Sequence, residues 1–124
     1  MVRRWLVYSA ALVFLVAGVT ACGSGRRLPA RTVSVELTEF TISPSSLSGQ
    51  VGQPLTFQVT NTGVLEHTLT IQDSSGKEAA SLTVKPGGSD VLTIVPFSSG
   101  EWPISCSIPG HELAGMTASL MVTP

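Results

Sequence analysis

Apolar and polar residues alternate along most of the chain after Thr32, in short runs that are typical of half-buried β-strands. Turn-forming residues, mainly Gly, Pro, Asn, Asp and Ser, separate these runs. No stretch repeats its apolar residues with the 3.6-residue period of a helix. The pattern therefore predicts an all-β fold, a Greek-key β-sandwich or barrel of about seven to eight short strands. The clearest runs lie at 33–38, 55–59, 69–71, 82–84, 91–95, 102–105 and 118–122.

The expected core is modest, because the chain has few large side chains after its first segment. We expect Phe40, Phe57, Phe97 and Trp102 to share it with the aliphatic residues of the strands. Met121 lies in the alternation of the last strand, and we expect it in the core as well.

The first 21 residues form a segment of a different kind. Two arginines precede an almost wholly apolar stretch, residues 5–19, which is short for a membrane-spanning helix and suits a signal peptide. The stretch ends in small residues before Cys22, which resembles the bacterial lipoprotein signal. We therefore expect residues 1–21 to be a lipoprotein signal peptide, Cys22 to be lipidated, and residues 22–32 to be a flexible tether. The alternative is an uncleaved membrane anchor, and both interpretations place the domain outside the cytoplasm.

The remaining residues, 33–124, are enough for one compact domain. This part of the chain contains two lysines, no arginine and all eight acidic residues, which gives it a net charge of −6. Such a domain is a poor binder of nucleic acid. We expect it to be monomeric and to meet the membrane only through its lipid anchor.

The residues able to bind a soft metal ion are few and concentrated. Cys106, His111 and Met116 fall within eleven residues, and His67 opens a predicted strand elsewhere in the chain. One thiolate, two imidazoles and one thioether form a ligand set suited to mononuclear copper in electron transfer. With Cys22 lipidated, Cys106 is a single thiol in an oxidising compartment, and copper would account for it.

Other interpretations of these residues are weaker. Taken singly, His67 suits a strand surface, His111 a loop cap and Met116 a core filler. A binuclear copper centre needs a second cysteine in the loop, and a second copper site needs further histidines. Structural zinc prefers four Cys or His ligands, for which a thioether is a poor substitute.

From Val33 to Val122 the sequence resembles the cupredoxins, the small blue copper proteins. The resemblance rests on Asn61-Thr-Gly-Val-Leu-Glu-His67, on Pro86-Gly87, and on Gly100-Glu-Trp-Pro-Ile-Ser-Cys106-Ser-Ile-Pro-Gly-His111 with Gly115-Met116. It implies one type 1 copper, with His67, Cys106 and His111 as strong equatorial ligands and Met116 as the weak axial ligand. Four residues separate Cys106 from His111, against two in plastocyanin. Thr68 stands where plastocyanin and azurin have Asn, and we expect its backbone N–H to reach the sulfur.

The resemblance implies a carrier of single electrons rather than an enzyme. Electrons would leave through His111, where an apolar rim suits brief docking with a cytochrome, an oxidase or a reductase. No nucleophile, acid–base pair or open metal position indicates catalysis. The alternatives are a periplasmic or cell-surface copper carrier or store, and a metal-free adhesion or structural domain. The expected rim consists of Ile108, Pro109, Leu113 and Ala114.

Overall fold

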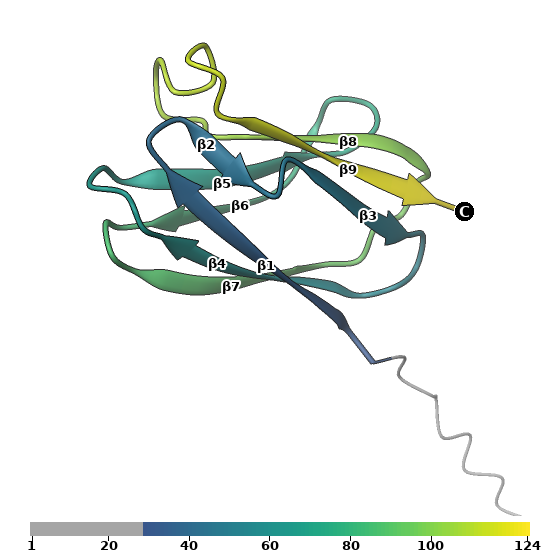
Figure 1. Cartoon of the computed structure of the whole chain (residues 1–124). Coiled ribbons are helices and arrows are strands. Elements are labelled where there is room, and N and C mark those ends of the chain that lie inside the picture. The colour runs from purple at the N-terminus through teal and green to yellow at the C-terminus, as the bar shows by residue number, and fades with distance from the viewer. Residues whose placement is uncertain (1–28) are drawn as a thin grey trace, which may run out of the picture.

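A computed structural model describes residues 29–124, and this part of the chain folds into two packed β-sheets without any helix (Figure 1). The predicted all-β sandwich is therefore confirmed. The strands are β1 (Arg31–Thr38), β2 (Thr41–Ser43), β3 (Ser46–Gln50), β4 (Leu55–Asn61), β5 (His67–Gln72), β6 (Glu78–Val84), β7 (Ser89–Ile94), β8 (Gly100–Ser105) and β9 (Thr117–Thr123).

Strands that are distant in the sequence pair within each sheet. One sheet has the order β2-β1-β4-β7 and the other the order β3-β9-β8-β5-β6. Most neighbours are antiparallel, but β1 pairs in parallel with β4, and β3 pairs in parallel with β9. These parallel pairings join the start of the domain to its middle and its end. As a result, the ends of β1, β4 and β8 and the starts of β5 and β9 meet at one end of the sandwich.

Two short strands of the nine in residues 29–124, β2 and β3, lie outside the runs that the pattern predicts. β2 and β3 come from a Ser-, Pro- and Gly-rich segment whose composition indicates turns, and each buries a single apolar side chain, Ile42 and Leu47. Pairing with β1 and β9 makes them strands, a tertiary effect that local sequence does not encode. β1 also begins two residues before the expected boundary. Arg31, assigned to the tether, instead pairs with Leu55 and donates a hydrogen bond to the Ser48 carbonyl.

The core lies between the sheets and is only partly the one expected. Phe57 and Trp102 are fully buried, as predicted. Phe40 and Phe97 are 40% and 66% exposed, so their assignment to the core was wrong. Met121 is 49% exposed, because Leu120 and Val122 of β9 face inward. Since all three residues are apolar, the sequence does not indicate which of them point into the core.

The expected signal peptide and the lipidated Cys22 lie outside the described residues. Within residues 29–124, no helix is long and apolar enough to cross a membrane. The prediction of a membrane anchor therefore stays a prediction.

Candidate metal centre

The strand ends bring the predicted ligand residues together at one end of the sandwich. His67 is the first residue of β5, Cys106 directly follows β8, and Met116 directly precedes β9. His111 lies in the yellow-green loop between β8 and β9 (Figure 1). His67, Cys106 and Met116 are fully buried, and His111 is only 9% exposed.

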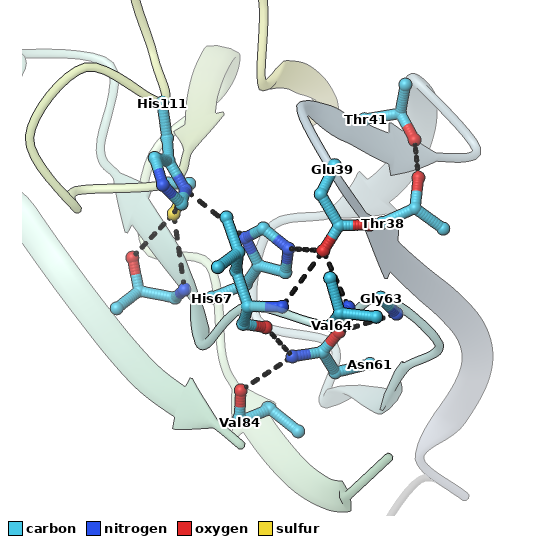
Figure 2. Close-up of polar contacts among 12 residues, drawn as sticks. Thr38, Glu39, Thr41, Asn61, Gly63, Val64, His67, Val84 and His111 are labelled. Atoms are coloured by element: carbon cyan, nitrogen blue, oxygen red, sulfur yellow. Dashed lines mark hydrogen bonds and ion pairs between the residues drawn. The ribbon is translucent and has the colours of Figure 1, made fainter. Parts of the chain in front are cut away.

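Three donor atoms converge on one point. The two Nδ1 atoms of His67 and His111 are 3.3 Å apart, and the Cys106 Sγ lies 3.5 Å from the His111 Nδ1. All three donor atoms lie within 4.8 Å of one another. Figure 2 shows the His67 ring between this cluster on one side and Glu39 on the other.

These distances fit a shared ion. Metal–imidazole bonds are about 2.0 Å long and metal–thiolate bonds about 2.3 Å, so around one trigonal ion two nitrogens lie about 3.5 Å apart and a nitrogen and the sulfur about 3.7 Å apart. The separations of 3.3 Å between the two nitrogens and 3.5 Å between the His111 nitrogen and the sulfur are close to these values. The convergence of two imidazole nitrogens and one sulfur in a buried space suits a soft metal ion such as copper.

The β8–β9 loop is held in a compact shape by its own backbone. The Cys106 N–H donates to the Met116 carbonyl at 3.1 Å, and the Met116 N–H donates to the His111 carbonyl at 3.1 Å. Gly110 and Gly115 have φ angles of 86° and 100°, which favour glycine, and they supply the sharp bends. The backbone thus fixes Met116 beside both other ligand residues of the loop.

Thr68 connects the two ligand-bearing segments. Its backbone N–H donates to the Cys106 sulfur at 3.3 Å, as the sequence predicts. Its hydroxyl accepts the Ser107 N–H at 2.7 Å and lies 3.6 Å from the Cys106 sulfur. Although Thr replaces the Asn of plastocyanin and azurin, a side-chain bond between the two segments is present.

The outer side of His67 faces a carboxylate. Glu39, in the turn between β1 and β2, places its Oε1 3.5 Å from the His67 Nε2. The same oxygen accepts the N–H groups of Val64 and Leu65 at 2.7 Å and 3.0 Å. The hydrogen bond from Leu65, with that from Val64 adding to it, lowers the pKa of Glu39 below its ordinary value near 4.5, although partial burial opposes the shift. The group is therefore a carboxylate at neutral pH.

Phe40 covers the other histidine. Its ring meets the His111 ring edge-on, with the centroids 5.2 Å apart and the planes at 85°. Phe40 has a φ of 64°, an uncommon conformation for a bulky residue, which places it at the tip of the β1–β2 turn beside the site. The residue expected in the core thus lies against a candidate ligand.

A match over most of the sequence shows the family of this chain. The profile of the cupredoxin-like domain matches residues 10–118. The chain belongs to the cupredoxin-like family. In this cupredoxin, His67, Cys106, His111 and Met116 have the arrangement of a type 1 copper site.

Solved structures agree with this cupredoxin in fold. An auracyanin from the photosynthetic bacterium Roseiflexus castenholzii is 20% identical, with a TM-score of 0.71, and the match covers 77% of this chain and 98% of that one. Auracyanin B is 21% identical, with a TM-score of 0.71 and coverage of 78% and 91%. Auracyanin A of Chloroflexus aurantiacus, described as a "blue" copper protein, is 15% identical, with a TM-score of 0.63 and coverage of 74% and 99%. Comparison with curated proteins finds no match.

Sequence reasoning missed two groups around the site of this cupredoxin. In the sequence Glu39 is only one of eight acidic residues, although in the structure it lies against His67, which is 28 positions away in the chain. The Thr68 hydroxyl accepts the Ser107 N–H across the two segments, a bond that the sequence does not indicate. Neither has a local sequence signal, because each contact depends on which strand ends meet.

Proposed function

We propose that this cupredoxin is a mononuclear copper protein outside the cytoplasm that carries single electrons between redox partners. His67, Cys106 and His111 would hold the ion as equatorial ligands, and Met116 would be the weak axial ligand. The convergence of the two Nδ1 atoms and the Sγ carries this proposal. Bound copper would supply a one-electron Cu(II)/Cu(I) couple.

The residues around the ligands keep the site rigid and exclude water from it. Thr68 donates its backbone N–H to the Cys106 sulfur, which stabilises the thiolate and orients it. The backbone bonds of Cys106 and Met116 fix the ends of the β8–β9 loop. A scaffold that does not rearrange keeps the cost of each electron transfer low. It also makes exchange of the ion slow, which favours an electron carrier over a copper carrier or store.

An apolar surface surrounds His111 and would be the docking site. Pro109 and Leu113 of the expected rim are exposed, and Leu113 is 95% exposed. Val64, in the segment before His67, is a further exposed apolar residue, with 80% of its surface accessible. Contacts between electron-transfer partners are usually small, below about 1,200 Å². A surface of this kind suits brief binding of a cytochrome, an oxidase or a reductase.

The acidic character of the domain would steer such a partner. Glu66 and Glu112 are exposed close to the ligands in sequence, and the domain from Val33 onward has a net charge of −6. A partner with a basic face would associate faster, and salt would slow the association.

Attachment to a membrane would come from Cys22. Lipidation at this cysteine would tie the domain to the outer side of a membrane through residues 23–30. Mass spectrometry of the native protein tests this, because a lipidated Cys22 would be the N-terminal residue. A Cys22→Ser variant should lack the added lipid mass, and a wild-type protein with an unmodified Cys22 would contradict the lipid anchor.

Visible absorption tests the copper site itself. We expect Cu(II) to produce an intense thiolate-to-copper band, ascorbate to bleach it, and reoxidation to restore it. A Cys106→Ser variant should lack the band. Bound but colourless copper that a mild chelator removes quickly would favour the carrier, and no binding would overturn the copper site.

Met116 is tested by the reduction potential. Met116→Leu removes the thioether and keeps an apolar side chain of similar size, so the protein should keep copper while its potential rises. Met121→Leu is the matched control, because Met121 is exposed on β9. Equal potentials in the Met116→Leu variant and the wild type would exclude Met116 as a ligand.

A further inference from the structure

The buried His67 has one nitrogen directed at the metal centre and the other directed at Glu39 (Figure 2). When Nδ1 binds a metal ion, the ring's proton must lie on Nε2. His67 Nε2 is fully buried and has no conventional hydrogen-bond partner among the described residues. The Glu39 Oε1 lies 3.5 Å away and can accept this proton.

The Glu39 carboxylate is held in this place by the backbone. Its Oε1 accepts two N–H groups, those of Val64 and Leu65. The buried Asn61 fixes the same segment, since its amide donates to the Leu65 carbonyl at 2.7 Å and its Oδ1 accepts the Gly63 N–H at 2.9 Å. The carboxylate is thus oriented before any metal binds.

Gly63 leaves the space that the carboxylate occupies. A Cβ built on Gly63 would overlap the Glu39 carboxyl group. The φ of Gly63 is not in the positive range, so the backbone does not itself require glycine there. Its small size instead allows the carboxylate to lie against the loop and face His67.

We propose that Glu39 is a positioning residue of the copper site, which orients His67 through its Nε2–H and makes it a stronger donor. The inference rests on the proposed function, since it assumes that His67 binds copper. A carboxylate behind a ligand histidine fixes the tautomer and the ring orientation and raises the basicity of the ligand. A more basic imidazole and a nearby negative charge both favour Cu(II) over Cu(I). Glu39 therefore lowers the reduction potential.

The first test is Glu39→Gln, which keeps the shape and a hydrogen-bond acceptor but removes the charge. We expect the reduction potential to rise and the ratio of Cu(II) to Cu(I) affinity to fall by roughly 10-fold, the low end of the effect for such partners. Glu66→Gln is the control, because Glu66 is exposed beside His67 and no contact ties it to the ring. Its effect on the potential should be smaller and should vanish at high salt.

The second test moves the carboxylate without changing its chemistry. Gly63→Ala should displace the Glu39 carboxyl group and raise the potential in the same direction as Glu39→Gln. If both variants act through the same contact, their effects will not add in the double variant. Urea unfolding of the copper-free proteins checks the fold, since a purely structural role would change stability and leave the potential unaltered.

The possible outcomes separate this inference from the proposed function. A wild-type protein without a copper band would overturn both. A wild-type blue band together with an unchanged potential in Glu39→Gln would overturn the role of Glu39 alone. The same holds if Glu39→Gln behaves like Glu66→Gln and its effect disappears with salt, because a general charge effect then suffices.

Discussion

Replacing Thr68 with valine removes the hydroxyl that joins the two ligand-bearing segments and keeps the shape of the side chain. Thr68 is only 8% exposed, so the lost bonds are not freely replaced by water. The Ser107 N–H loses an acceptor at 2.7 Å, and the Cys106 sulfur loses a hydroxyl contact at 3.6 Å. The backbone N–H of Thr68 still reaches the sulfur at 3.3 Å.

The size of the effect follows from these contacts. A partly buried N–H without its acceptor costs about 1–2 kcal/mol in the free energy of unfolding. In a domain of this size each kcal/mol corresponds to roughly 4–8 °C in Tm. Loss of a donor to the thiolate also makes the sulfur a stronger donor to Cu(II), so the reduction potential should fall, opposite to the effect of Glu39→Gln.

Urea unfolding of the copper-free protein and voltammetry of the copper-loaded protein measure the two effects. Thr68→Ser keeps a hydroxyl at this position, so its free energy of unfolding and its reduction potential should be close to those of the wild type. Thr56→Val is the matched control: the Thr56 hydroxyl pairs with that of Thr93 at 2.9 Å in an exposed position, and its loss should cost less than about 0.5 kcal/mol. Equal stability of Thr68→Val and Thr56→Val, with the potential unchanged, would refute the reasoning.

Three further predictions concern stability. Leu69→Ala, in the fully buried part of β5, should cost about 2–5 kcal/mol in urea unfolding, and a loss below 1 kcal/mol would mean that the site collapses around the cavity. The Ser75 hydroxyl, together with the N–H groups of Ser75 and Lys77, lowers the pKa of Asp73 below 3.8; its stabilising effect should therefore be present above that pH and disappear as the pH falls through the lowered pKa. Asp73→Asn should flatten this part of the acid-unfolding curve, and an unchanged curve would contradict the assignment. Free Cu(II) at about 100 times its Kd should stabilise the protein by about 2.7 kcal/mol, an effect absent from Cys106→Ser.

The candidate ligands could be found in the sequence because the chain has so few soft donors. Cys106, His111 and Met116 are close in sequence, and His67 is the only other histidine. The seven clearest strands could also be predicted, since a period of two in hydrophobicity is a local property. The sequence therefore carried enough information for the fold class and for the donor set.

What could not be predicted depends on pairings between distant segments. β3 is a strand because it lies beside β9, and Glu39 contacts His67 because the ends of β1 and β4 meet through a parallel pairing. Phe40 was expected in the core because of its size, but the turn at the end of β1 carries it to His111. Such contacts are set by register, which short alternating runs leave open.

The direction of β1 has a consequence for how an anchored domain would be attached. The strand enters the sandwich at Arg31 and reaches the end that carries the ligand residues only at Thr38, about 23 Å further along. If Cys22 is lipidated as we propose, the attachment to the membrane would enter the domain at the start of β1, at the end of the strand farther from the ligand residues. The tether itself would then leave the end of the sandwich that carries His111 uncovered. The direction of β1 thus separates the point of attachment from the metal centre by the length of one strand.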